Sequence, residues 1–230
     1  MTYFRYYVVI YMQGMGKQEA DISAVSRLRI GVDGEGVTTL VAFMYCPLNC
    51  RYCLNPQTLS DSYPHRRYSV TDLYRELRKD ELYFLATGGG VTFGGGEPLL
   101  RHGFIREFRE VCGPDWKINV ETSLNVPREA LEDVMPVVDS YIIDIKDMDP
   151  AIYSSYTGKD NARVIENMML LSEAGLAGRC VVRVPLIPGY NDSSAVAESE
   201  RKVRNLGFEN IDLFEYSVSH GERKRNMQNA

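Results

Sequence analysis

The sequence of 230 residues lacks an apolar run of the roughly 18 residues that a membrane-spanning helix requires. It also lacks a basic excess, because 26 Lys and Arg stand against 31 Asp and Glu and the net charge is −5. That balance argues against nucleic acid as a partner. The most apolar opening stretch, residues 7–12, is short, and no small-residue cleavage site follows it. We therefore expect a cytoplasmic protein that binds neither membrane nor nucleic acid.

Cysteine is too scarce and too unevenly spread for a disulfide framework. The chain has five, and three of them, Cys46, Cys50 and Cys53, fall within eight residues. In a reducing compartment such clustering indicates metal binding or catalysis. Three thiolates can hold three irons of an iron–sulfur cubane and leave the fourth iron open. Alternatively, they can bind zinc with a fourth ligand such as His65. The other two cysteines are expected to be small buried hydrophobes, too few to hold a second cluster.

Strand-like and helix-like segments alternate along the rest of the chain. The expected strands are 38–45, 91–93, 117–121, 140–145, 179–185 and 210–216. The expected helices are 69–79, 99–111, 127–134, 162–174 and 194–206. The alternation predicts parallel strands joined by helices, in either an open doubly wound sheet or a partial barrel. In both architectures the chemistry is found at the carboxyl ends of the strands.

Three regions are expected along the chain. Residues 1–30 are an N-terminal extension, in which the tyrosine- and valine-rich segment 2–12 suits an added edge strand and 13–20 suits a loop. Residues 31–218 contain the alternating strands and helices. Residues 219–230 are a polar tail, and its shortness is expected to leave the mouth of the site open.

Motifs in five places resemble those of the radical S-adenosylmethionine (SAM) enzymes. The triplet Cys46-Pro-Leu-Asn-Cys50-Arg-Tyr-Cys53, with an aromatic residue before the last cysteine, is similar to their signature. The other four blocks resemble, in family order, those of the glycyl-radical enzyme activating enzymes, such as the pyruvate formate-lyase activating enzymes. These blocks are VDGEG at 32–36, GGGVTFGGGEPLL at 88–100, DIK at 144–146 and RVPLIPGYND at 183–192. No cysteine lies between Cys53 and Gly88, which resembles the single-cluster type.

The resemblance implies a fold and a pair of cofactors. The fold is an α/β partial (βα)6 barrel, TIM-like and with parallel strands. The cofactors are a [4Fe–4S] cluster on Cys46, Cys50 and Cys53, and SAM, whose amine and carboxylate chelate the open iron. Reduction of the cluster then splits SAM into methionine and a 5′-deoxyadenosyl radical.

The same resemblance implies which residues contact SAM. Gly95, Gly96 and Glu97 are expected at its amine, because glycines allow close approach and a carboxylate accepts from an ammonium. The other expected contacts are Asp144, Lys146, Arg183, Ser217 and the backbone of Tyr52 and Leu54. A candidate monovalent-cation site comprises Glu121, Thr122 and Asp144, whose oxygens suit a hard cation. Two residues depart from the family pattern: Gly94 replaces a serine and Glu121 replaces an aspartate.

The expected activity is abstraction of a hydrogen from a backbone glycine of a partner enzyme, which leaves a glycyl radical on that partner. The expected electron donor is of the flavodoxin or ferredoxin type. One alternative is a radical enzyme of the same chemistry that acts on a small molecule or peptide, such as a cyclase or a relative of 7-carboxy-7-deazaguanine synthase. The alternative from another class is a non-catalytic iron–sulfur or zinc module.

Overall fold

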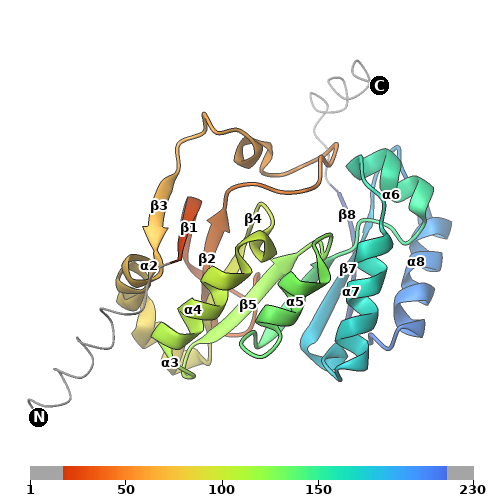
Figure 1. Cartoon of the computed structure of the whole chain (residues 1–230). Helices are drawn as coiled ribbons and strands as arrows, with labels where there is room; N and C mark the ends of the chain where they lie inside the picture. The colour runs from red at the N-terminus through yellow and green to blue at the C-terminus, as the bar shows by residue number, and fades with distance from the viewer. Residues whose placement is uncertain (1–17, 217–230) are drawn as a thin grey trace, which may run out of the picture. The chain divides into compact units, whose positions relative to one another are not determined.

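The structure is a computed structural model that describes residues 18–216 (Figure 1). The chain divides into two compact units. Unit 1 contains the chain up to Tyr45, Gln57–Glu121 and Glu129–Ser140; unit 2 contains Cys46–Pro56, Thr122–Arg128 and the chain from Tyr141 onward. The expected edge strand at 2–12, the tail at 219–230 and Ser217 lie outside the described residues, and the expected region boundaries remain predictions.

Unit 1 is built on five strands in the order β3-β1-β2-β4-β5. They are β1 (Glu19–Ile30), β2 (Val37–Phe43), β3 (Arg66–Ser69), β4 (Gly90–Gly95) and β5 (Lys117–Thr122). Its helices are α2 (Val70–Leu77), α3 (Glu81–Thr87), α4 (His102–Cys112) and α5 (Arg128–Val134), with short 3₁₀ turns η1 (Pro56–Leu59), η2 (Arg78–Asp80) and η3 (Pro98–Arg101). β1 is antiparallel to both β2 and β3, whereas β2, β4 and β5 are parallel.

An aromatic core joins the strands of unit 1 to α4. Phe93 stacks on Phe43 with a centroid distance of 5.5 Å and meets Phe108 edge-on at 5.3 Å. α4 buries Phe104, Ile105 and Phe108, the one-sided spacing of an amphipathic helix. At Gly90, an added Cβ would lie 2.1 Å from the Lys117 carbonyl oxygen, so β4 and β5 can approach only because this residue has no side chain.

The predicted helix start at Ser69 is confirmed. The Ser69 hydroxyl accepts a hydrogen bond from the Asp72 backbone N–H at 3.2 Å, which satisfies one of the unpaired donors at the start of α2. α2 buries Val70, Leu73 and Leu77. The helix ends at Leu77 rather than Lys79, because the chain continues there as the turn η2 and then α3.

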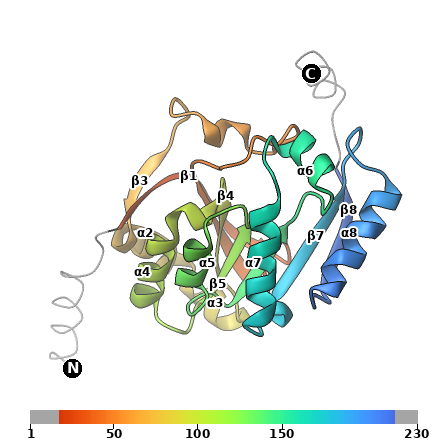
Figure 2. The same ribbon diagram turned by 45° about the vertical axis from the view of Figure 1, so that its right-hand side comes forward.

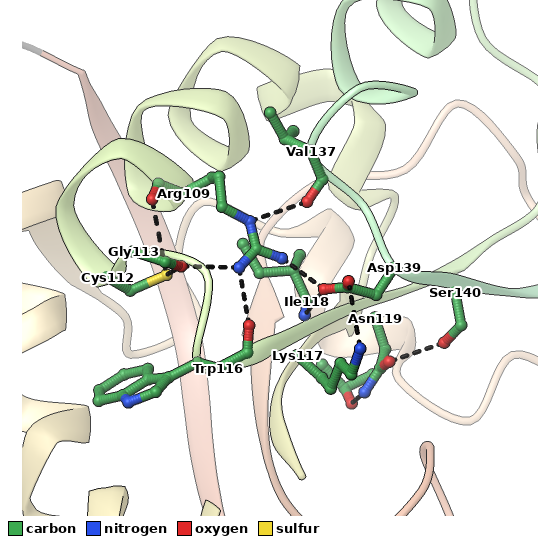
Figure 3. Close-up of polar contacts among 11 residues, drawn as sticks. Arg109, Cys112, Gly113, Trp116, Lys117, Ile118, Asn119, Val137, Asp139 and Ser140 are labelled. Carbon is green, nitrogen blue, oxygen red and sulfur yellow. Dashed lines mark hydrogen bonds and ion pairs between the residues drawn. The ribbon is translucent and has the colours of Figure 1, made fainter. Parts of the chain in front are cut away.

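Arg109 of α4 fixes the chain that enters β5 and the loop that precedes β6 (Figure 3). Its guanidinium donates to the carbonyls of Gly113, Trp116 and Val137 at 2.8, 2.7 and 3.0 Å. It also pairs with Asp139, whose carboxylate accepts from the Ile118 N–H at 2.8 Å. One cation thus bonds to three carbonyls that lie outside the regular helices and strands.

Unit 2 has three parallel strands in the order β6-β7-β8, flanked by helices (Figures 1 and 2). The strands are β6 (Ser140–Asp144), β7 (Cys180–Leu186) and β8 (Ile211–Glu215). The helices are α6 (Pro150–Thr157), α7 (Ala162–Glu173) and α8 (Ser193–Asn205), with the turn η4 (Ala177–Arg179). None of the helices between residues 18 and 216 combines the length and apolar character needed to cross a bilayer.

All six predicted strands are present, as β2 and β4 to β8. The prediction of a loop at 13–20 is wrong for its last two residues, because Glu19 and Ala20 begin β1. β1 pairs with β2 and β3, and its residues Ala20 and Ile22 are buried. The sequence analysis also missed β3, α3 and α6. These elements span only four, seven and eight residues, too few for a period to be recognised, so tertiary contacts decide their structure.

Candidate functional site

Strained backbone follows the carboxyl ends of several strands. Tyr45, Leu124 and Lys146 have positive φ angles of 72°, 56° and 61°. Each lies two residues beyond the end of a strand, β2, β5 and β6 respectively. Gly95, the last residue of β4, has φ 95°. A non-glycine residue in this region costs about 1–3 kcal/mol, and such strain gathers at ligand sites. The strand ends are therefore the first place to look for function.

The three clustered cysteines lie on one loop of unit 2, directly after β2. None of the three forms a disulfide, and all three are partly buried. Burial raises the pKa of the Cys50 thiol, and the Lys146 ammonium partly offsets that rise. Three soft thiol donors on one short loop suit the three corner irons of a [4Fe–4S] cluster.

The single-zinc alternative is less well supported. Within residues 18–216, no three His, Cys, Asp or Glu side chains gather around the position of one ion. A cubane needs its thiolates farther apart than a single ion does, because each binds a different iron. His65, the suggested fourth zinc ligand, is exposed in unit 1, and its Nδ1 lies 2.8 Å from the Tyr63 carbonyl oxygen.

The end of α6 holds the cysteine loop in place. The Asn49 N–H donates to the Thr157 carbonyl at 2.9 Å, and the Arg51 N–H donates to the Tyr156 carbonyl at 3.1 Å. These acceptors are among the last carbonyls of the helix, which have no partner within it. The residues on both sides of Cys50 are thus bonded to a rigid element of the same unit.

A charged cluster beyond the end of β6 and on the neighbouring strands β7 and β8 includes two groups that act on Cys50, Lys146 and Asp144. Lys146 Nζ is 3.3 Å from Asp144 Oδ2 and 3.4 Å from the Tyr216 hydroxyl. Arg183 Nη1 is 4.0 Å from Asp144 Oδ1, and Arg183 Nε is 3.7 Å from Asp212 Oδ2. Burial, the largest single effect, acts to lower the pKa of Lys146, but Asp144 and the smaller contributions of its other neighbours together outweigh it and raise this pKa well above its usual value. Two fixed cations and a carboxylate can bind the two ends of an amino acid.

A buried carboxylate braces the loop that carries Lys146. Asp147 is 2% exposed. Its oxygens accept from Asn191 Nδ2 at 2.9 Å and from the Ser199 hydroxyl at 3.0 Å. Asp192, which follows Asn191 in the sequence, caps α8 by accepting a hydrogen bond from the Ala195 N–H at 2.9 Å. The Asn-Asp pair that ends the 183–192 motif therefore joins the loop after β7 to the loop after β6.

The aromatic residue of the cysteine motif contacts the same loop after β7. The Tyr52 hydroxyl donates to the Pro188 carbonyl at 3.2 Å, and its ring lies edge-on to Tyr190 at 5.7 Å. Leu54, by contrast, is 79% exposed. The predicted contact of the Tyr52 and Leu54 backbone with the nucleoside stays a prediction, as does the role of Ser217.

The glycine-rich turn of unit 1 follows β4. The Gly96 N–H donates to the Phe43 carbonyl at 2.9 Å, and the Glu97 N–H donates to the Tyr45 carbonyl at 2.7 Å. A Cβ on Gly96 would lie 2.0 Å from the Tyr45 carbonyl oxygen, so only glycine fits there. The Glu97 side chain is 1% exposed and accepts from the Leu99 N–H at 3.2 Å. Because this turn belongs to unit 1, its sharing of a site with the unit 2 residues stays a prediction.

The two departures from the family pattern lie side by side on β4 and β5. A Cβ on Gly94 would be 3.3 Å from Glu121 Oε2 and 3.2 Å from Leu40 Cδ1. The longer glutamate therefore reaches the space that a side chain at position 94 would occupy. The candidate cation site of Glu121, Thr122 and Asp144 draws on both units and stays a prediction; within unit 2, the Thr122 hydroxyl accepts from the Leu124 N–H at 2.9 Å.

This contact predicts that the two positions are energetically coupled. Gly94→Ser alone is expected to lower the free energy of unfolding by about 1–3 kcal/mol, because the new side chain crowds Glu121. Gly94→Ser with Glu121→Asp is expected to recover at least half of that loss. Urea unfolding of both single variants and the double variant measures the coupling. Purely additive effects would contradict it.

Several residues near the cysteine loop escaped the sequence analysis as functional candidates. They are Asp147, Tyr156, Tyr190, Asn191 and Tyr216. Tyr190 and Asn191 belong to the 183–192 motif, which could have indicated them. Tyr156 lies on helix α6, which the sequence analysis did not predict. Tyr156 is 1% exposed. Burial raises the pKa of its phenol, and a hydrogen bond with Tyr216 acts in the same direction.

Comparisons with known proteins point to one superfamily. The pattern of the Radical SAM superfamily matches residues 40–198. The (2S)-3-sulfopropanediol dehydratase activating enzyme of Klebsiella oxytoca is 37% identical over 132 residues, 57% of this chain and 41% of that protein. The isethionate sulfite-lyase activating enzyme of Desulfovibrio desulfuricans is 26% identical over 246 aligned positions, 80% of this chain and 79% of that protein. The chain thus spans less than half of the first relative and about four fifths of the second.

Solved structures agree on the fold. A domain of a pyruvate formate-lyase-activating enzyme from Bacteroides vulgatus matches with a TM-score of 0.50 and 29% identity, over 61% of this chain and 92% of that one. Streptococcus suis SuiB, bound to the precursor peptide SuiA, matches with a TM-score of 0.59 and 16% identity, over 83% of this chain and 44% of that one. These likenesses confirm the predicted fold class, an α/β partial barrel in which parallel strands dominate. The chain belongs to the radical SAM superfamily, and it is an enzyme whose cofactors are a [4Fe–4S] cluster and S-adenosylmethionine.

Proposed function

We propose that this enzyme is a glycyl-radical enzyme activating enzyme. One observation carries the proposal: sequence relatives that are 26–37% identical are activating enzymes for several different partner enzymes. The Staphylococcus aureus pyruvate formate-lyase-activating enzyme is among them, 32% identical over 70% of this chain and 66% of that protein. The proposed substrate is therefore a glycine in a partner protein.

The proposed reaction is a balanced one-electron process. A [4Fe–4S] cluster held by Cys46, Cys50 and Cys53 would pass one electron from a flavodoxin- or ferredoxin-type donor to SAM, which would give methionine and a 5′-deoxyadenosyl radical. That radical takes a hydrogen atom from the glycine Cα, which yields 5′-deoxyadenosine and a glycyl radical on the partner. Hydrogen-atom transfer needs no acid or base from the protein, so the chain has to bind, orient and shield the reactants.

Residues of unit 2 are suited to those tasks. Cys46, Cys50 and Cys53 hold the cluster, and α6 fixes their loop through two backbone hydrogen bonds. Lys146 and Arg183 offer cations to a ligand carboxylate, and Asp144 offers an acceptor to its amine. The backbone strain at Lys146 indicates that the surrounding structure holds this side chain at a chosen position.

The test is substrate-dependent formation of 5′-deoxyadenosine. The reconstituted enzyme, SAM and a low-potential reductant are combined with the product of a neighbouring gene, with short glycine-centred peptides, or with a panel of metabolites. The expected result is turnover with the protein, weaker turnover with the peptides, and a glycyl-radical signal in electron paramagnetic resonance (EPR) spectra.

Peptides with alanine in place of the central glycine are the matched control and are expected to give no glycyl signal. Turnover that depends on a small molecule, with none from any protein or peptide, would sink the proposal and favour the small-molecule alternative.

A further inference from the structure

The loop after β6 makes a tight turn centred on Lys146. The Asp147 N–H donates to the Ile145 carbonyl at 2.8 Å, a hydrogen bond that closes a turn of only three residues. Lys146, the central residue, has a φ angle of 61°. A three-residue turn with a positive φ at its centre is the rare and strained form of the γ-turn. Because a residue with a Cβ does not favour this backbone by itself, other contacts have to hold the turn closed.

The Asp147 carboxylate provides contacts of that kind. Its Oδ2 accepts a hydrogen bond from Asn191 Nδ2 at 2.9 Å, and its Oδ1 accepts from the Ser199 hydroxyl at 3.0 Å. Oδ1 also accepts from the Asp149 N–H at 2.8 Å. Asp147 is 2% exposed, so water hardly competes for these bonds. The residue that closes the turn is therefore tied down through both of its carboxylate oxygens.

The two side-chain donors belong to regular elements of unit 2 or are bonded to them. Ser199 is 1% exposed on α8, and its hydroxyl also accepts from the Met148 N–H at 3.0 Å. The Asn191 amide also donates to the Pro185 carbonyl in β7 at 2.9 Å. The turn after β6 is thus anchored to a helix and to the neighbouring strand.

The turn decides where the Lys146 ammonium lies. Its Nζ is 3.3 Å from Asp144 Oδ2 and 3.4 Å from the Tyr216 hydroxyl, and Lys146 is 9% exposed. On the other side of the turn, the Ile145 N–H donates to the Arg183 carbonyl at 3.3 Å. The direction of a side chain follows its backbone, so relaxation of the turn to a negative φ would carry the Lys146 side chain away from Asp144.

We infer that Asp147 is a positioning residue: it anchors the strained turn to α8 and to the loop after β7, and so holds Lys146 Nζ where the SAM carboxylate binds. Asp147 takes no part in bond breaking. The inference rests on the part of the proposed function that assigns Lys146 to the SAM carboxylate. It does not depend on the partner protein, and its first test needs neither SAM nor the partner.

The first test is chemical labelling of Lys146 in the full-length protein. An amine-acetylating reagent is added at constant pH, and mass spectrometry follows each lysine. Wild-type Lys146 is expected to react slowly, because it is buried and paired with Asp144. Asp147→Asn keeps the size of the side chain but cannot accept from all three donors, and it is expected to raise the rate at Lys146 about tenfold. Lys159, which is exposed in the same unit, is expected to react equally in both proteins.

The second test connects the turn to the cofactor. In protein with a loaded cluster, Asp147→Asn is expected to weaken equilibrium SAM binding about tenfold, and Lys146→Ala at least as much. The double variant is expected to bind SAM no more weakly than Lys146→Ala alone, because Asp147 acts through Lys146. The iron content is expected to stay the same in all three variants.

Leu171→Ala is the matched control for a general loss of stability. Leu171 is fully buried near the end of α7, so its truncation removes core packing and no hydrogen bond of the turn. Urea unfolding is expected to show the lower stability, whereas the labelling rate of Lys146 and the SAM affinity are expected to stay unchanged.

Ser199→Ala keeps the inference falsifiable if Asp147→Asn does not fold. It removes one of the three donors to the carboxylate, so the same two changes are expected at smaller size. An unchanged labelling rate of Lys146 in Asp147→Asn and Ser199→Ala would overturn the inference. It would also be overturned by an equal rise in Leu171→Ala, or by losses of SAM affinity that simply add in the double variant.

Discussion

Replacement of any one of Cys46, Cys50 and Cys53 with alanine is expected to abolish reductive cleavage of SAM. Each thiolate holds one iron, so two cannot support a stable cluster with one open iron. The wild-type protein, reconstituted without oxygen, is expected to contain about four irons per chain, and each variant far less. Iron content, visible absorbance and production of 5′-deoxyadenosine measure the effect. A single variant with full cleavage activity would contradict the assignment.

The chain supplies matched controls for this experiment in its two remaining cysteines. Burial raises the pKa of Cys112 to about 11 and that of Cys180 to about 12, so both are protonated, unreactive thiols at neutral pH. The Cys112 sulfhydryl donates to the Gly113 carbonyl at 3.4 Å (Figure 3), and that of Cys180 donates to the Leu176 carbonyl at 3.4 Å. Alanine at either position is expected to leave the iron content unchanged.

Removal of the Asp144 carboxylate is expected to weaken SAM binding by roughly ten- to a hundredfold. A charge-assisted hydrogen bond is worth on the order of 1.5–3 kcal/mol, which converts to that range of affinity. Asp144→Ala also frees Lys146 and Arg183 from their shared counter-ion, so the cations lose their fixed positions. Equilibrium binding to protein with a loaded cluster measures the effect, and the iron content is expected to stay the same. Glu97→Ala is expected to act in the same direction.

Asp212→Ala is the control for this prediction. Asp212 pairs with the same arginine at 3.7 Å, but its side chain is 53% exposed, whereas that of Asp144 is 24% exposed. An exposed ion pair contributes little, so SAM affinity is expected to change less than threefold, or about 0.6 kcal/mol. Equal losses in the two variants would show that Arg183, and not Asp144, dominates. If SAM affinity is unchanged in both Asp144→Ala and Glu97→Ala, the SAM site does not include these two residues.

Local sequence patterns were sufficient for the elements whose signals are short-range. β2 and β6 are largely apolar runs, VTTLVAF and SYIID, as is typical of strands covered on both faces. The Ser69 cap depends on Asp72, only three residues away. The cysteine triplet places three thiols on one loop, so its spacing predicts a shared metal centre, and the family resemblance implies that this centre is a [4Fe–4S] cluster. Gly96 belongs to a recognisable turn, and the structure adds the reason, since a Cβ would collide with the Tyr45 carbonyl.

Only the tertiary structure revealed the contacts between distant parts of the chain. The bond from Arg51 to Tyr156, the brace from Asn191 to Asp147 and the fit of Glu121 beside Gly94 join residues 27 to 105 positions apart. No periodicity encodes such pairs, because each depends on where two strand ends or helix ends meet. The sequence by itself thus determined the family, the cofactors and the parallel strands. The folded chain decided that α6 supports the cysteine loop and that Lys146 and Arg183 share Asp144 as a counter-ion.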